Sequence, residues 1–423
     1  MFDKILKIFQ IKELRNKILY VLGIMIVFRL ASHFPVPGVD TEKLRAFFEN
    51  NQLFGLLNLF SGGGLSSLSI VMLGVGPYIT SSIIMQLLTM IFPSFKEMYH
   101  EGGEAGRQKF NQYSRILTVP LALLQGYGMI KLFQNQGVLD IMSNQTMIYT
   151  LVVITAGTIF LMWLGELITE QGIGNGISLI IFAGIVSQMP ETAIGKLTLM
   201  DASQIPGYII FLVFSVLVVA SVVLANEAQR NLPVSYAKRV RGGKMYGGVN
   251  TYLPLKVNSA GMIPIIFAMS IMLFPGMIGS FLVTSKYPAV ASAAVYIVAL
   301  FENQTFYGAM YFIMVVLFTF FYTAVVFEPH TVSENLQKQG GFIPGIRPGN
   351  PTKEYLSYVI NRITLAGAVF LGLIAVLPFI GQAFTGDTSL VLGGAAVLIV
   401  VGVVLDTVRQ IEAQIVTKDY EQY

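Results

Sequence analysis

Long apolar stretches separated by polar segments extend along almost the whole chain. A helix needs about 20 mostly apolar residues to cross the hydrocarbon core of a bilayer. By this measure the pattern predicts ten transmembrane helices, at residues 18–34, 70–92, 114–133, 147–168, 174–189, 206–226, 258–281, 305–327, 359–381 and 389–407. The fifth stretch is short and begins in glycine, and only a few residues around Thr385 separate the last two. The chain is therefore expected to be an all-α membrane protein.

Two segments near the N-terminus depart from this alternation. Residues 1–17 carry five cations and gather apolar side chains on one helical face, which predicts an amphipathic helix lying on the lipid surface. No small-residue cleavage site follows, so the first apolar run is expected to stay as a span. Residues 53–69, LFGLLNLFSGGGLSSLS, are too few to span and too apolar for water. This segment is expected to fold back into the bundle, where irregular backbone can line a protein cavity.

Composition agrees with a membrane location and limits the chemistry. Of the 423 residues, 54% are apolar and 12% are charged, whereas soluble domains carry about 25% charged residues. The chain has no cysteine, which excludes disulfides and a thiol nucleophile. His33, His100 and His330 lack metal-ligand spacing, and no phosphate-binding GxxxxGK[ST] motif occurs. We therefore expect neither an enzyme nor a bound cofactor or metal.

The basic residues orient the predicted spans. With the N-terminus placed in the cytoplasm, cations in the inside segments outnumber those outside about four to one. Both termini are therefore expected to be cytoplasmic. The inside loops 227–257 and 328–358 each run for about thirty residues, and loops of that length are seldom mere connectors.

The spans themselves contain almost no charge. Arg29 is the only ionisable residue near the middle of a predicted span. Ion-coupled transporters usually place a carboxylate or a broken helix there, which disfavours a secondary transporter for a small amphipathic solute but leaves it as the alternative. A wide conduit closed by a ring of isoleucines needs no such charge, because a dewetted apolar constriction blocks water and ions.

Five long motifs in one order carry a resemblance to a known family. They are FSGGGLSSLSI (60–70), GVGPYITSSIIMQLL (74–88), WLGELITEQGIGNGISLIIFAGI (163–185), LPLKVNSAGMIP (253–264) and FIPGIRPG (342–349). Together they resemble the bacterial SecY family over essentially the whole chain, although GIGNGIS alone would not be specific. The family implies a fold of ten helices in two inverted five-helix halves around a central pore. Unfolded polypeptides cross the plasma membrane through this pore, and signal sequences and membrane spans leave it sideways into lipid.

The resemblance also implies a division of the chain and a set of partners. The parts are a cytoplasmic amphipathic helix (1–17), an N-terminal half (18–189) with a plug at about 54–73, a C-terminal half (190–407) that includes both long loops, and a cytoplasmic tail (408–423). The implied partners are small membrane subunits resembling SecE and SecG, the motor ATPase SecA, the ribosome, signal peptides and nascent chains, and the bilayer.

Two groups of residues are implied to close the pore. The apolar pore ring corresponds to Val75, Ile79, Ile177, Ile181, Ile263, Ile266 and Ile399. Isoleucines at four-residue spacing are equally consistent with ordinary helix core, and Val75 is the least secure member because it is smaller. The plug corresponds to Phe60, Ser61, Gly62, Gly63, Gly64, Leu65, Ser66 and Ser67. The alternative for the plug is a re-entrant helix of fixed position.

Two further groups are implied to admit the substrate and bind partners. A lateral gate between the second and third spans and the seventh and eighth would carry the polar residues Thr80, Gln125 and Asn258. These residues are equally consistent with static helix contacts. Docking of SecA or the ribosome is implied at Lys238, Arg239, Arg241, Lys244 and Arg347. The alternative for these cations is a solvated positive-inside charge.

Overall fold

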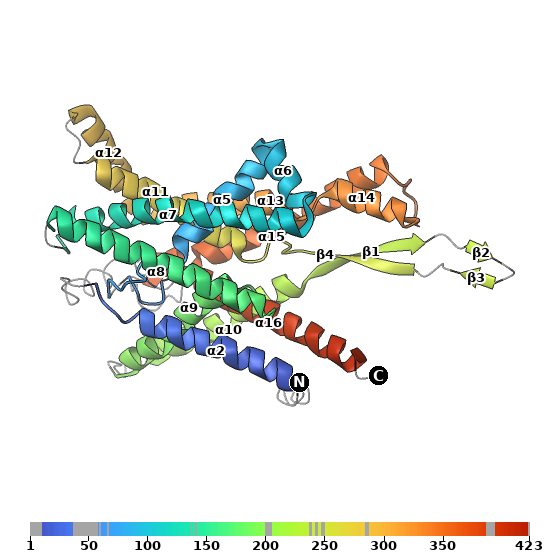
Figure 1. Cartoon of the computed structure of the whole chain (residues 1–423), viewed down its shortest axis with the longest axis horizontal. Helices are drawn as coiled ribbons and strands as arrows, with labels where there is room; N and C mark the ends of the chain where they lie inside the picture. The colour runs from blue at the N-terminus through green and yellow to red at the C-terminus, as the bar shows by residue number, and fades with distance from the viewer. Residues whose placement is uncertain are drawn as a thin grey trace.

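The computed structural model describes residues 11–36, 58, 61–65, 67–135, 137–139, 142–198, 205–236, 239–241, 244–246, 250–283, 287–385 and 394–421. Most helices in these ranges lie lengthwise in an elongated bundle (Figure 1). Each predicted span overlaps a different helix, and these helices are α2 (Lys12–Ala31), α5 (Gly76–Ile91), α7 (Gly103–Asn135), α8 (Asn144–Glu170), α9 (Gly176–Thr198), α10 (Ile205–Glu227), α11 (Ile263–Leu282), α13 (Gln304–Val326), α15 (Asn350–Thr385) and α16 (Gly394–Glu421).

Length and composition alone identify fewer certain spans than ten. Four of the described helices are long and apolar enough to cross a membrane. A fifth span results if α5 and α6 (Pro93–His100), which are bent by 115° relative to each other, are counted together. The bend lies at Phe92, whose extended backbone is the conformation favoured before a proline. The helices support a multi-pass membrane fold, and the count of ten stays a prediction.

Two helices begin later than the apolar pattern predicts. The second span was expected from residue 70, but α5 begins at Gly76, and residues 70–75 form successive turns. The seventh was expected from residue 258, but α11 begins at Ile263. In both cases a glycine with positive φ, Gly74 or Gly261, and a proline in the first helical turn determine the start.

The first long basic loop folds as a β-hairpin, which the all-α expectation missed. β1 (Gln229–Tyr236) pairs antiparallel with β4 (Asn250–Lys256), and β2 (Arg239–Arg241) pairs with β3 (Lys244–Tyr246). From the second loop, β5 (Gly341–Phe342) joins β1. Leu232 and Leu255 of the hairpin pack with Ile343 and Leu356 in one apolar cluster. Strand pairing and this apolar cluster therefore join the two long loops to each other.

The remaining differences concern helix number and length. α12 (Pro288–Glu302) is an apolar helix of 15 residues within a segment expected to be only a connector. α14 (Pro329–Lys338) lies in the second loop. The last helix continues to Glu421, so residues 408–421 of the predicted tail belong to α16. The end of α16 and the start of α2 lie toward the hairpin end of the bundle, and α12 lies at the opposite end (Figure 1).

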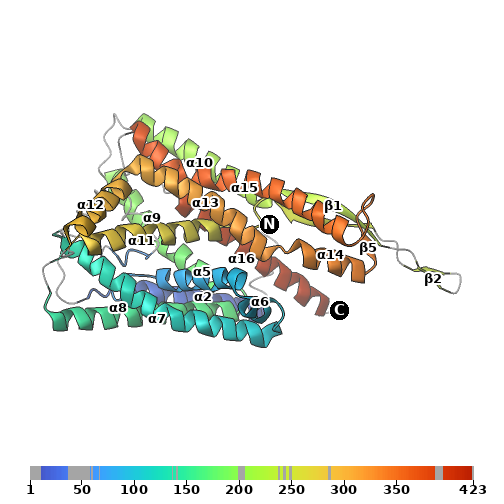
Figure 2. The ribbon, with the colours of Figure 1, turned by 90° about the horizontal axis from the view of Figure 1, so that it is seen from above.

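The largest apolar cluster joins helices from both predicted halves. Figure 2 shows α2, α5, α7 and α8 along one side and α10, α13 and α15 along the other. Buried side chains of α2, α5, α8 and α9 pack together with side chains of α11 and α16 in this cluster. The core therefore lies where the two predicted halves meet.

Candidate functional site

All seven residues predicted for the pore ring lie in this single apolar cluster. Val75, Ile79, Ile181, Ile266 and Ile399 are buried, and Ile177 and Ile263 are partly buried against them. Val75 directly precedes α5, and Ile263 is the first residue of α11. The members thus come from α5, α9, α11 and α16, which are far apart in the sequence.

A glycine contact between α8 and α9 positions one side of this cluster. A Cβ atom on Gly176 would lie 1.8 Å from the carbonyl oxygen of Gly165, and a Cβ on Gly165 would lie 2.4 Å from Cδ1 of Ile177. The backbone N–H of Gly176 also donates to Oγ1 of Thr169 at 2.9 Å. The glycine-rich GIGNGIS segment therefore serves close helix packing, which lets Ile177 enter the cluster.

The described part of the predicted plug is irregular and anchored to its neighbours. Gly62 and Gly63 have φ of 67° and 84°, a region that favours glycine. A Cβ on Gly62 would lie 2.7 Å from the ring of Phe28 and 3.1 Å from Cα of Gly184, so this turn packs tightly on α2 and α9. The Ser67 hydroxyl donates to the Ser32 carbonyl at 3.1 Å. Phe60 and Ser66 lie outside the described residues.

Arg29 holds the predicted plug segment by a hydrogen bond that sequence reasoning did not find. Its Nη1 donates to the carbonyl oxygen of Gly62 at 2.8 Å. In the sequence, Arg29 stands out as the one charge near the middle of a predicted span, but its partner lies 33 residues away in irregular backbone. A cation in a predicted span, bonded to a carbonyl of the predicted plug, is a functional candidate by position.

We expect Arg29→Met to loosen the plug, because methionine retains an apolar stem but donates no hydrogen bond. A hydrogen bond from a charged group contributes about 1.5–3 kcal/mol, which corresponds to at least about tenfold in an opening equilibrium. In a Ser61→Cys background, the rate of modification by a water-soluble maleimide is expected to rise by that factor. Lys131→Met, which removes a cation bonded to Gln134 instead, is the control. Equal rates in the parent and in Arg29→Met would contradict an anchoring role.

The predicted gate residues fall into two places. Gln125 of α7 and Thr80 of α5 are both buried, and the Gln125 Nε2 donates to Thr80 Oγ1 at 3.3 Å. Asn258 lies elsewhere, in the turn before α11, where its Nδ2 donates to Oδ1 of Asn226 on α10 at 2.6 Å. The expected cluster of three is therefore not formed, because α11 begins after Asn258 and leaves that residue at the end of α10.

Two cavities correspond to these two places. A cavity of about 80 Å³ is lined by ring, plug and gate residues together, among them Ile79, Ile181, Ile266, Ser61 and Gln125. A second cavity of about 240 Å³ has a mixed lining, with polar residues such as Asn258, Asn226 and Arg409 beside apolar residues such as Met262 and Leu398. The residues predicted for the ring thus lie beside those predicted for the plug, while Asn258 faces a separate cavity near the hairpin.

Asn258→Leu is expected to change translocation efficiency only a few-fold, because buried amide hydrogen bonds between membrane helices contribute about 1 kcal/mol. Efficiency would be measured with substrates whose signal sequences increase stepwise in hydrophobicity. Asn226→Leu removes the same hydrogen bond from its other partner and is expected to shift the series in the same direction. If Asn258→Leu leaves the translocation efficiency of every substrate in the series unchanged, Asn258 contributes only to packing.

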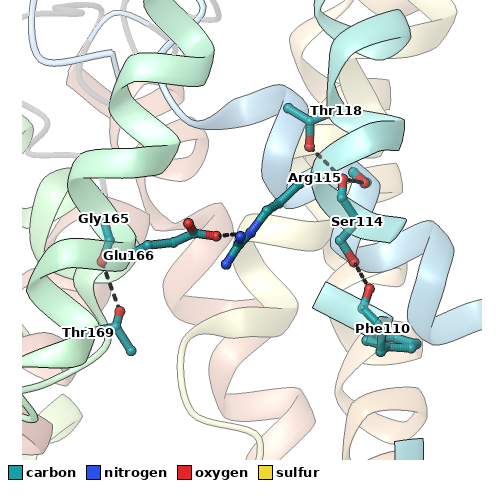
Figure 3. Close-up of polar contacts among 8 residues, drawn as sticks. Phe110, Ser114, Arg115, Thr118, Gly165, Glu166 and Thr169 are labelled. Carbon is teal, nitrogen blue, oxygen red and sulfur yellow. Dashed lines mark hydrogen bonds and ion pairs between the residues drawn. The ribbon is translucent and has the colours of Figure 1, made fainter. Parts of the chain in front are cut away.

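A polar network fixes α7, which carries the gate residue Gln125, to α5 and α8. Arg115 Nε pairs with Glu166 Oε1 of α8 at 2.5 Å (Figure 3). The Ser81 hydroxyl of α5 donates to the Ser114 carbonyl at 2.5 Å. An ion pair and a hydrogen bond at Arg115 and Ser114 of α7 therefore connect these three helices.

The basic residues predicted for docking lie away from the membrane bundle. Arg239, Arg241 and Lys244 are on β2 and β3, beyond the far ends of β1 and β4 (Figure 1). Lys238 lies outside the described residues. Arg347 is exposed in the second loop, and its carbonyl oxygen accepts from Thr352 Oγ1 at 2.8 Å. The structure thus fixes the backbone of Arg347 while its side chain faces solvent.

The end of α16 is attached to the N-terminal half. Lys418 Nζ lies 3.0 Å from Oε2 of Glu13 on α2, and Gln414 Nε2 donates to the Gly172 carbonyl at 2.7 Å. Hydrogen bonds from Lys418 and Lys17 lower the pKa of the Glu13 carboxyl. The segment predicted as a tail therefore contacts both α2 and the turn between α8 and α9.

Proteins of similar sequence place the chain in a family. A family model described as SecY matches residues 69–408. A protein translocase subunit SecY from Streptomyces coelicolor is 43% identical over 437 residues, which cover 98% of each chain. The corresponding protein from Mycobacterium tuberculosis is 44% identical over 438 residues, with 97% of each chain covered. The chain belongs to the SecY family. The prediction made from the five motifs is confirmed.

Solved structures share the SecY-family fold at much lower sequence identity. A protein-conducting channel matches with a TM-score of 0.65 and 19% identity, covering 94% of this chain and 91% of that chain. Sec61 from a canine ribosome–channel complex matches with a TM-score of 0.62 at 19% identity and the same coverage. These likenesses confirm the helical channel fold. The roles of the ring, plug, gate and docking residues stay predictions.

Proposed function

We propose that this chain is the pore-forming subunit of a protein translocase. It passes unfolded polypeptides across the bacterial plasma membrane and inserts membrane proteins into it. One observation carries the proposal: the seven apolar ring residues of α5, α9, α11 and α16 meet in one cluster, in a chain 43% identical to protein translocase subunits. The chain acts as a channel subunit and not as an enzyme.

The proposed resting state is closed in two ways. The apolar ring excludes water and ions by dewetting. The plug segment lies against the ring, since Ser61 and Leu65 line the same cavity as Ile79 and Ile266. A solved SecY structure describes a plug domain that stabilises the closed channel and maintains a membrane seal. We assign the same role to the segment from about residue 54 to 73.

The proposed lateral gate is the contact of α11 with α5 and α7. Buried Thr80 and Gln125 lie on α5 and α7, on the side of this contact that belongs to the N-terminal half. Separation of α11 from these helices would open the ring toward lipid. Because Arg115 fixes α7 to α8, the helices of the N-terminal half would move together and the gate would open at α11.

Energy for transport comes from partners in this proposal, since the sequence has no nucleotide-binding motif. Arg347 and the basic tip of the hairpin would bind SecA or the ribosome through acidic side chains or phosphates. Related Sec61 and Ssh1 channels are known in ribosome complexes. Exposed apolar side chains on α10, such as Leu212 and Leu217, would contact lipid or small subunits resembling SecE and SecG.

The proposed topology places both termini, the β-hairpin and α14 in the cytoplasm and α12 outside. The positive-inside charge bias supports this orientation, as does the position of the start of α2 and the end of α16 toward the hairpin (Figure 1). The two proposed halves are residues 18–189 and 190–407, joined between α9 and α10. They pack together through the cluster that contains the ring.

Reconstitution tests the proposal against the alternative of a secondary transporter. Vesicles containing the chain and a SecE-like subunit, supplied with SecA and ATP, are expected to protect a signal-bearing unfolded substrate from added protease. Protection is expected to disappear when SecA or the signal sequence is omitted. Ion-gradient-dependent uptake of a small amphipathic solute, without protein protection, would instead establish the transporter.

A further inference from the structure

An ion pair connects the two predicted halves where α5 and α13 end. Lys96 Nζ lies 3.1 Å from Oε1 of Glu328, although the residues are 232 positions apart. Lys96 is on α6, which follows α5 after the bend at Phe92. Glu328 directly precedes α14 and follows α13. Figures 1 and 2 both show α6 beside the α13–α14 junction.

The pair lies at one end of the seam that the proposed gate must open. Leu87 of α5 and Phe318 and Tyr322 of α13 all pack against the cluster that contains the ring. The Phe267 ring of α11 contacts Phe318 and Tyr322 edge to face, so α13 is bound to α11 on the C-terminal side. Any separation of α11 and α13 from α5 would therefore pull Glu328 away from Lys96.

The geometry orients the carboxylate toward the lysine. The Thr331 hydroxyl donates to Oε2 of Glu328 at 2.9 Å, which leaves Oε1 for Lys96. The side chains are 54% and 34% exposed, and ion pairs this exposed are weak and screened by salt. A weak contact of this kind can influence an opening equilibrium without preventing it.

We propose that Lys96 and Glu328 form a latch across the cytoplasmic end of the lateral gate. The latch helps to set how hydrophobic a signal sequence must be to open the channel. This inference rests on the proposed function and adds a pair of residues that determine substrate selectivity. A weakly hydrophobic signal supplies little binding energy for opening, so it responds most to loss of the latch.

Charge exchange tests the latch. Lys96→Glu and Glu328→Lys are each expected to raise translocation of a substrate with a weak signal by a few-fold, and to leave a strong-signal substrate unchanged. The double variant Lys96→Glu/Glu328→Lys restores the pair in reverse and is expected to return to the parent value. The difference in weak-signal translocation between each single variant and the parent is expected to shrink at high salt. Failure of the double variant to restore the parent value would overturn the latch.

A matched control comes from a pair within one half. Lys338 Nζ lies 2.9 Å from Oε1 of Glu334, one turn earlier on α14. The hydrogen bond from Lys338 lowers the pKa of the Glu334 carboxyl, as a formed pair requires. Lys338→Glu and Glu334→Lys make the same charge changes without crossing the gate, and they are expected to leave the signal threshold unchanged. The same shift in these variants would assign the effect to surface charge and overturn the proposal.

Cysteine cross-linking gives a readout that does not depend on transport, and the chain contains no other cysteine. Lys96→Cys/Glu328→Cys is expected to cross-link with a short bismaleimide in the idle channel and to cross-link less when a stalled substrate occupies it. The cross-linked channel is expected to lose translocation of weak-signal substrates. Full translocation of these substrates by the cross-linked channel would refute the latch alone. A parent chain that translocates no substrate would refute the proposed function itself.

Discussion

Replacing Ile181 and Ile266 with serine is expected to raise the resting ion conductance of the reconstituted channel by at least about tenfold. Both side chains are buried in the cluster that joins α9 to α11. Hydroxyl groups in place of these apolar side chains favour wetting of the constriction, and lowering a barrier by about 1.4 kcal/mol raises a rate about tenfold. Two polar hydroxyls in the constriction would therefore allow water and ions to enter the closed pore.

The matched control for this double variant is at exposed positions of α10, outside the cluster that contains the ring. Leu217→Ser and Val213→Ser replace exposed apolar residues with the same side chain. These changes are expected to leave the conductance at the parent level in planar bilayers. Unchanged conductance in the Ile181→Ser/Ile266→Ser channel, with the protein inserted and monodisperse, would remove both residues from the constriction.

Arg347→Glu is expected to leave the protein inserted and stable while reducing SecA-driven translocation at least about tenfold, since a hydrogen bond to a charged group contributes about 1.5–3 kcal/mol. The structure supports a local effect. Gly345 and Gly349, with φ of 85° and 96°, form the turn, and Ser333 Oγ donates to the Gly349 carbonyl at 2.8 Å. The exposed Arg347 side chain therefore contributes little to holding the loop.

Two further variants separate docking from general charge. Arg347→Lys is expected to restore only part of the activity, because lysine lacks the planar set of guanidinium donors. Lys353→Glu makes the same change of charge nearby, at another exposed position, and is expected to translocate normally. Full translocation by Arg347→Glu in the vesicle assay would defeat the assignment. Loss of stable insertion would show that the role is structural.

The apolar pattern predicted each of the main helices, because membrane crossing imposes a length that can be read directly from the sequence. The same criterion missed α12, whose 15 residues fall short of a span. It also missed β1, although the alternation around Leu232 and Val234, both buried, was available as a signal. The length of α16 was underestimated because charged residues interrupt the apolar run after Thr407, yet the helix continues and buries Ile415.

The site was predictable to the extent that it depends on helix-borne apolar residues. The ring residues assemble because each lies on or at the start of a helix of the expected type. The contacts of Arg29 with Gly62 and of Lys96 with Glu328 were not predictable, since each joins segments brought together only by the tertiary fold. The resemblance grouped Asn258 with Thr80. In the structure Asn258 lies in the turn before α11 and bonds to Asn226 instead.

The central claim is that translocating polypeptide passes through the ring, and disulfide cross-linking to a stalled substrate measures this directly. A single cysteine is placed either at Ile266 in the ring or at Leu217, which is exposed on α10, in a chain without other cysteines. A substrate with one cysteine in its stalled segment is expected to form a disulfide at Ile266→Cys and not at Leu217→Cys. Protected substrate that reacts with neither position, or only with Leu217→Cys, would contradict passage through the ring.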